Sequence, residues 1–272
     1  MATVSSNIVT ITGLEPSLVP KQWGEHVRIV GMSEYRQVAL SLAHAFAADD
    51  LAFYLLASDD MAGLSQEDKW KLHVDIFQYM VAAHCMNGEV HVIGPDHEGV
   101  ALWMPPGKNI DDWWTILRSG MWRLYFQLSS EGRKRYYDEL LPLLHETKAE
   151  VLGEQDDNAY YLVYLGTKPH ARGRGYAEKL LRTMIERASS RFHFPAADAE
   201  NRPVYLESSS LANNAYYAKR GFVVKKDIFL KRGPVPVRLS IMVREPRPVP
   251  RLTNLPAVAT LKSRTAGLVK MA

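Results

Sequence analysis

The 272-residue sequence contains a single cysteine, Cys85, so an internal disulfide framework is excluded. One unpaired thiol is typical of proteins from a reducing compartment. The sequence also lacks any apolar run close to the ~20 residues that a membrane-spanning helix requires. Its N-terminus has neither a secretory apolar segment nor the arginine-rich, acid-poor composition of a transit peptide. These absences predict a cytoplasmic protein with no membrane partner.

Charge of one sign is not in clear excess either. Lysine and arginine number 33 against 30 aspartates and glutamates, a net charge of +3, and no dense basic stripe occurs. We therefore expect no nucleic-acid partner. No group of histidine, cysteine and acidic residues has the spacing of metal ligands, so no metal is expected. Cys85 follows Val81, Ala82 and Ala83, which favours a small core residue over a catalytic thiol.

The chain is long enough to bury a substantial core, and 47% hydrophobic with 23% charged residues is the composition of a globular protein. We predict a lead-in over residues 1–26, with one short strand at Ile8–Ile11, and a single domain over residues 27–245. Residues 246–272 are predicted to form a tail, because three early prolines mark a linker and its charged residues are all basic. A homodimer is compatible with the sequence.

Hydrophobic periodicity predicts alternating helices and strands. Ser65, followed by two acidic residues, begins a well-capped helix, and Ser33 is expected to cap an earlier one. Residues 108–148, rich in tryptophan and leucine, are predicted to be a helical insertion of two or three helices, which form either a second core or the wall of a substrate pocket. The other predicted elements are strands at Val27–Val30, Val90–Ile93, Val100–Met104, Tyr160–Leu165 and Val204–Glu207, a half-buried alternating strand at Val235–Val243, helices at Tyr176–Ser189 and Ala212–Arg220, and an irregular insertion at Phe192–Arg202.

A glycine-rich loop, Arg172-Gly173-Arg174-Gly175-Tyr176-Ala177, lies between a predicted strand and a predicted helix. A helix start presents unpaired N–H groups and attracts anions, and glycines let a phosphate approach the backbone. Arg172 and Arg174 could add positive charge to the same site. The loop lacks the Gly-Lys-Ser/Thr end of a P-loop, and Glu178 stands where a dinucleotide fingerprint has glycine or alanine. From the loop alone, a merely structural turn remains the alternative.

The surroundings of the loop carry a family resemblance. Pro169 and the Arg-x-x-Gly-x-Ala pattern before an amphipathic helix resemble motif A of the GNAT family of N-acetyltransferases. Tyr205-Leu206-Glu207-Ser208, then Asn213, Tyr217 and Gly221-Phe222, resemble its motif B. Within the family, residues 88–245 are most similar to puromycin N-acetyltransferase and its relatives. The resemblance implies an α/β fold, layered as α+β: a twisted, mixed, mostly antiparallel sheet of about seven strands, flanked by helices, with splayed central strands.

The resemblance also implies that acetyl-CoA is the cosubstrate. Pantetheine would pair with the backbone where the two central strands separate, and a backbone N–H there would polarise the thioester carbonyl. Asn213 resembles the residue that holds the pantetheine arm, although an ordinary helix cap is the alternative. The implied donor-binding residues are Leu165, Gly166, Thr167, Arg172, Gly173, Arg174, Gly175, Tyr176, Ala177 and Asn213.

Two residues carry the expected catalysis. Tyr217 matches the family tyrosine near the sulfur and is assigned the acid role, against a merely packed aromatic ring. Glu207 is the leading base, acting directly or through a water, against a carboxylate that caps or pairs with arginine. Tyr216 would face elsewhere. His145 lies where the puromycin enzyme also carries a histidine, although a structural role is the alternative.

These inferences predict an N-acetyltransferase in which the amine of a small molecule attacks acetyl-CoA directly in a ternary complex. The acceptor would be a xenobiotic, an antibiotic or a metabolite. One alternative is an acetyltransferase for protein lysines or N-termini, which would need an open groove. Another is a non-catalytic acyl-CoA sensor, against which the presence of Tyr217 argues.

Overall fold

The computed structural model describes residues 18–185 and 200–247. The predicted strand Ile8–Ile11, most of the predicted insertion Phe192–Arg202 and the tail from residue 248 lie outside the described residues.

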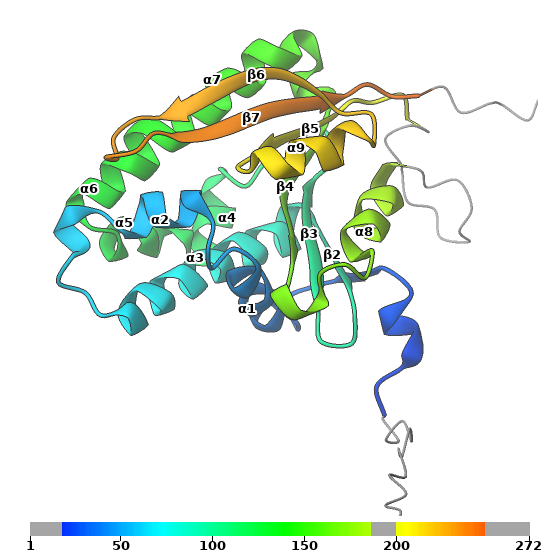
Figure 1. Ribbon diagram of the computed structural model, residues 1–272, viewed down its shortest axis with the longest axis horizontal. Coiled ribbons are helices and arrows are strands. Elements are labelled where there is room, and N and C mark those ends of the chain that lie inside the picture. The colour runs from blue at the N-terminus through cyan, green and yellow to red at the C-terminus, as the bar shows by residue number, and fades with distance from the viewer. Residues whose placement is uncertain (1–17, 186–199, 248–272) are drawn as a thin grey trace, which may run out of the picture.

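One sheet organises the described chain, with the strand order β1-β2-β3-β4-β5-β7-β6 (Figure 1). Every neighbouring pair is antiparallel except β4 and β5, which are parallel. The predicted mixed, mostly antiparallel sheet is thereby confirmed. The strands are β1 (Arg28–Val30), β2 (Glu89–Ile93), β3 (Gly99–Met104), β4 (Tyr160–Thr167), β5 (Val204–Ser208), β6 (Val223–Leu230) and β7 (Val237–Arg244).

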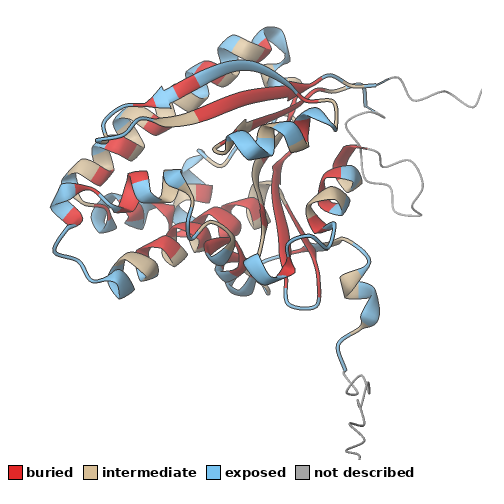
Figure 2. Ribbon diagram, in the orientation of Figure 1, coloured by how far each residue is buried: buried red, intermediate tan, exposed pale blue. Residues whose placement is uncertain are grey.

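Helices cover both faces of the sheet. Successive side chains of a strand point to opposite faces. On β3, Val100 and Leu102 join the core beneath α1 and α3, whereas Ala101 and Trp103 join the core beneath α8. β3 is therefore buried along its whole length (Figure 2). The α-helices are α1 (Tyr35–Ala45), α2 (Asp50–Leu56), α3 (Gln66–Asn87), α4 (Trp113–Ser119), α5 (Leu124–Gln127), α6 (Ser130–Arg133), α7 (Leu141–Leu152), α8 (Tyr176–Ile185) and α9 (Leu211–Ala218), and the 3-10 turns are η1 (Lys21–Gly24), η2 (Asp59–Met61), η3 (Met121–Arg123), η5 (Gly153–Asn158) and η6 (Pro169–Ala171).

No single helix in residues 18–185 or 200–247 is long and apolar enough to cross a membrane. By length and composition α1 and α2 pass such a test only as a pair, which is bent by 102°.

The two predicted serine caps have different outcomes. The Asp68 N–H donates to Ser65 Oγ at 3.0 Å, so the cap of α3 is confirmed. The cap at Ser33 is wrong, because α1 begins at Tyr35 and Glu34 holds the cap position without a capping side-chain bond. The Glu34 carboxylate instead binds Arg28 at 3.3 Å and His97 at 2.7 Å, which ties the start of α1 to the sheet.

β7 is not half-buried as its alternating pattern predicted. It lies between β5 and β6, and both of its faces are covered, so Ser240 and Arg244 are buried with the apolar residues. Each has a polar partner: Ser240 Oγ donates to Asp227 at 2.6 Å, and Arg244 Nε donates to the Arg220 carbonyl at 3.1 Å. These bonds offset the cost of burying polar groups in the sheet.

The helical insertion contains α4, α5 and then one long helical segment, in agreement with the predicted two or three helices. That segment runs through α6, a π-helix over Lys134–Leu140 and α7. Its π geometry is visible in the Leu141 N–H, which donates to the Tyr136 carbonyl five residues earlier. Pro142 follows directly, and a proline inside a regular α-helix would clash with a preceding carbonyl. The wider π turn lets the helix continue through this proline.

The central strands separate, as predicted. β4 pairs with β5 only at Tyr160–Leu162, opposite Val204–Leu206, while β4 continues to Thr167 and β5 to Ser208. On the other edge of β4, the register with β3 shifts so that Val163 has no paired residue, which is a β-bulge. The bulge bends β4 at the point where it leaves β5, and the backbone groups beyond it face an open gap.

Gly166 of β4 lies against α1. A Cβ at this position would lie 2.9 Å from both Ala45 Cβ and Phe46 Cε2. Gly166→Ala is therefore expected to lower the free energy of unfolding by about 1–3 kcal/mol, measured by urea denaturation. Gly63→Ala is the control, because its Cβ would meet nothing within 4 Å. Equal losses in the two variants would contradict this close packing.

Candidate active site

A cavity of about 360 Å³ lies at the gap between β4 and β5. Its walls come from those two strands, α9, α3, the α1–α2 connection and the helical insertion. Of the predicted site residues, Leu165, Glu207, Asn213 and Tyr217 line this cavity. The residues of the glycine-rich loop do not line it, because the loop lies beyond the far end of β4, at the start of α8 (Figure 1).

The glycine-rich loop has the geometry of an anion site. Gly173 and Gly175 have φ of +80° and +78°, and a Cβ on either would meet nothing within 4 Å. The Lys179 N–H, donating to the Gly175 carbonyl, makes the first backbone bond of α8. Among the described residues, no acceptor receives a bond from the N–H groups of residues 173–177. Open space beside unpaired donors at a helix start fits a pyrophosphate group.

The two loop arginines are engaged with the backbone. Arg172 donates to the Thr167 carbonyl at 3.3 Å and to the Ala45 carbonyl at 3.1 Å. Arg174 donates to the His170 carbonyl at 3.5 Å. Both side chains are exposed, and in this conformation they hold the loop in shape. The donors that the loop itself presents are its backbone N–H groups.

Two N–H groups of β4 face the gap. The Lys168 N–H donates to the Glu98 carbonyl on the β3 side at 2.8 Å. Because successive N–H groups of a strand point to opposite edges, those of Leu165 and Thr167 point toward the side that β5 has left. Gly166, between them, serves the packing of α1 described above. The predicted oxyanion donors are therefore directed into the open gap.

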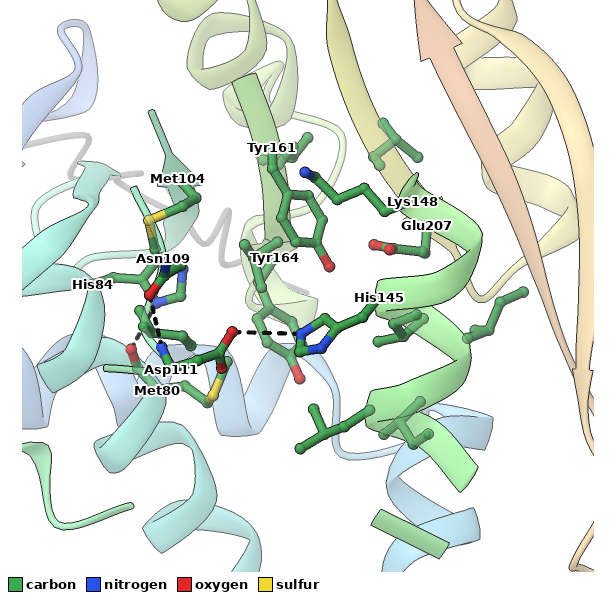
Figure 3. A pocket seen from close by; sticks show the side chains of 18 of the residues that line it. Met80, His84, Met104, Asn109, Asp111, His145, Lys148, Tyr161, Tyr164 and Glu207 are labelled. Atoms are coloured by element: carbon green, nitrogen blue, oxygen red, sulfur yellow. Dashed lines mark hydrogen bonds and ion pairs between the residues drawn. The ribbon is translucent and has the colours of Figure 1, made fainter. Parts of the chain in front are cut away.

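Glu207 lies at the end of β5 with its carboxyl group in the cavity (Figure 3). Burial raises the pKa of Glu207 to about 7, while the hydroxyl groups of Tyr161 and Tyr205 act in the opposite direction. Glu207 Oε1 and the Tyr205 hydroxyl are both buried without a hydrogen-bond partner. Within residues 18–185 and 200–247, no arginine pairs with this carboxylate, so the predicted alternative of an ion pair does not hold.

Tyr217 lies on the inner side of α9. Its ring is buried and contacts Tyr216 and Phe222 edge-on, at centroid distances of 5.4 and 5.7 Å. Burial raises the pKa of Tyr217 to about 12, so the hydroxyl stays protonated at neutral pH. Tyr216 does not line the cavity, and Arg220 lies 3.4 Å above its ring. Tyr217 therefore lines the cavity and Tyr216 does not, as expected.

Asn213 lies one turn before Tyr217 along α9, with an exposed side chain at the cavity. The alternative role of a helix cap does not hold, because α9 begins at Leu211 and Ser210 occupies the cap position.

Strand β4 and the insertion contribute side chains that the sequence did not assign to the site. Tyr161 and Tyr164 of β4 and Lys148 of α7 enter the cavity beside Glu207 (Figure 3). His145, on α7, lies 3.5 Å from the Asp111 carboxylate across the mouth, and both are more than half exposed. Sequence reasoning named His145 as a candidate but missed the others, because they carry no local motif and meet only after the insertion folds back. No group of three metal-binding side chains occurs in the part of the chain that the structure describes.

Comparison with known proteins places this geometry in a family. Residues 147–222, which include β4, the loop, α8 and α9, match the model of the Acetyltransferase (GNAT) family. The chain is 43% identical over 217 residues to an uncharacterized N-acetyltransferase of Schizosaccharomyces pombe, which covers 80% of this chain and 82% of that protein. The crystal structure of arylalkylamine N-acetyltransferase 2 from Aedes aegypti has the same fold, with a TM-score of 0.50 and 17% identity over 82% of this chain and 99% of that one. The chain is thus an N-acetyltransferase that belongs to the GNAT family.

Proposed function

We propose that this enzyme transfers the acetyl group of acetyl-CoA to the amine of a small molecule by direct attack in a ternary complex. The observation that carries the proposal is the cavity at the β4–β5 gap, which Glu207 and Tyr217 line together. GNAT membership implies acetyl-CoA as the donor. We further propose that the enzyme is a puromycin N-acetyltransferase-like member, on the motifs of residues 88–245.

The donor would lie along the open edge of β4. The N–H groups of residues 173–177 would bind its pyrophosphate, and the exposed backbone of Leu165–Thr167 with Asn213 would bind its pantetheine arm. Acetyl-CoA supplies a thioester carbonyl that an amine can attack. The cavity at the end of the arm excludes bulk water from that carbonyl.

The charges on the cavity wall favour a cationic amine. Five carboxylates line the cavity, against two lysines. Lys148 and Asp156 pair with each other, which leaves four carboxylates against Lys108. An ammonium group is therefore attracted to the site. The helical insertion covers the cavity, which favours a small acceptor over a protein segment. The carboxylates are Asp49, Asp111, Asp156, Asp157 and Glu207.

Three groups of the chain would then act in turn. Glu207 takes a proton from the bound ammonium, directly or through a water, and leaves a neutral amine. The N–H of Leu165 or Thr167 donates to the carbonyl oxygen as negative charge develops on it. Tyr217 donates its proton to the departing sulfur, and the second proton that the nitrogen loses as the amide forms restores the phenol. A C–N bond forms and a C–S bond breaks, so the products are an acetamide and a free thiol.

The test is thiol release from acetyl-CoA by the purified protein with a panel of amines. We expect release well above background with small cationic amines and little with lysine-containing peptides. Release with peptides alone would support the protein acetyltransferase. Binding of CoA without release for any amine would overturn the proposal and support a sensor.

A further inference from the structure

A row of aromatic rings leads from the cavity to the surface of the insertion. Tyr136 and Tyr137 line the cavity and contact each other at 4.8 Å between ring centroids. Tyr137 contacts Tyr125 at 5.8 Å, Tyr125 contacts Phe126 at 5.5 Å, and Phe126 contacts Trp122 at 6.1 Å. Trp122 lines the cavity itself, so the row begins and ends at cavity-lining residues, while Tyr125 and Phe126 stand between them on the exposed surface.

The outer three rings are exposed to solvent. Trp122, Tyr125 and Phe126, which we name the aromatic mouth, are 42%, 54% and 73% exposed. Arg123 lies 5.1 Å from the Trp122 ring and Arg133 lies 5.4 Å from the Tyr125 ring. Exposed rings grouped at the opening of a cavity mark a surface that contacts an apolar ligand.

Much of the cavity wall is also apolar. Met80, Met121, Leu140 and Leu144 line it, while Glu207 lies at the reactive end. An apolar path therefore runs from the buried carboxylate to exposed rings. The carboxylates attract an ammonium group, and the path accommodates a hydrocarbon.

We propose that the acceptor is an amphiphilic primary amine whose ammonium group lies at Glu207 and whose apolar tail extends onto the aromatic mouth. This inference rests on the proposed function and adds the chemical class of the acceptor. The exposed rings contact rings that line the cavity, so we infer that the group bound on them is part of the substrate. Trp122 and Phe126 contact the end of the tail.

The test uses unbranched primary alkylamines from butylamine to dodecylamine, each below its micelle concentration, with saturating acetyl-CoA. The value of kcat/KM is expected to rise about fourfold for each methylene that enters the apolar path, and to level off beyond the mouth. Phe126→Ala is expected to lower the ratio of kcat/KM for dodecylamine to that for butylamine by at least about tenfold. Because Phe126 is 73% exposed, this variant is expected to fold, and Trp122→Ala provides a second variant on the cavity side.

Phe229→Ala is the matched control, because Phe229 is 44% exposed on β6 and does not line the cavity. It should keep the wild-type ratio. A flat dependence on chain length with activity toward butylamine would overturn this inference and leave the proposed function standing. No release with any amine would overturn the proposed function itself. Loss of self-association or of binding to anionic vesicles in Phe126→Ala, with the ratio unchanged, would assign the surface to a second copy or to lipid and overturn the inference.

Discussion

Replacement of Glu207 by glutamine is expected to lower kcat by about 10²- to 10⁴-fold, the usual contribution of a positioned general base. The amide has nearly the shape of the carboxyl group and cannot take a proton from the bound ammonium. Glu150→Gln is the control, because Glu150 is an exposed carboxylate that pairs with Lys226. Similar losses in the two variants would contradict a specific role for Glu207.

The pH dependence gives a sharper test of the same residue. Because burial raises the pKa of Glu207 to about 7, the wild-type value of kcat/KM should rise with pH up to about 7 and then level off. Above that pH the carboxylate takes the proton of the ammonium form. In Glu207→Gln the reaction requires an amine that is already neutral, so kcat/KM should continue to rise toward the pKa of the amine. A plateau near pH 7 in the variant would show that another group is the base.

Glu207→Gln should at the same time gain stability relative to the wild type. The carboxyl pKa is about 7 in the folded chain and ordinarily 4.5, so between these values the folded state binds more protons than the unfolded state. Wild-type stability therefore falls as pH rises from about 4.5 to 7, by up to ~3 kcal/mol at 1.36 kcal/mol per pKa unit. The amide does not ionise, so urea denaturation at pH 5 and pH 8 should show the difference.

Tyr217→Phe is expected to lower kcat by about 10²-fold and to leave the KM for acetyl-CoA within about twofold of the wild-type value. The hydroxyl, protonated because burial raises the pKa of Tyr217 to about 12, can donate to the departing sulfur.

Tyr216→Phe is the matched control for that variant. Tyr216 is adjacent on α9, also loses a buried hydroxyl on substitution, and does not line the cavity. Its kinetic constants should stay close to those of the wild type. If both variants lose the same activity, the effect belongs to the packing of α9 and the acid role of Tyr217 is wrong.

The fold could be predicted where local patterns specify it. Ser65 caps α3 through its own side chain, and the predicted helix Ala212–Arg220 corresponds to α9 (Leu211–Ala218). Strand β6 was not predicted. Its first five residues are exposed, and two lysines among them interrupt the alternation of apolar and polar residues that identifies a strand. Likewise β7 was predicted to be half-buried, since alternation along one strand cannot show that its polar face is also buried in the folded protein.

The candidate site also has one half that the sequence predicts and one half that it does not. Its donor half has local signals, because the glycines of the loop and the residues of α9 are close in sequence to the strands they follow. Its acceptor half has none. Asp111 and His145 are 34 positions apart and meet only through the folded insertion, and Lys148 meets Glu207 across the cavity (Figure 3). The raised pKa of Glu207 is itself a product of this burial.

The short pairing between β4 and β5 has a mechanical consequence. Three residue pairs across this seam join β1–β4 to β5–β7, and beyond Leu162 the two halves of the sheet are not hydrogen-bonded to each other. A ligand that lies in the gap and hydrogen-bonds to both β4 and β5 would therefore take the place of a strand and connect the two halves of the sheet. Binding of such a ligand should therefore stabilise the whole sheet against separation of its two halves.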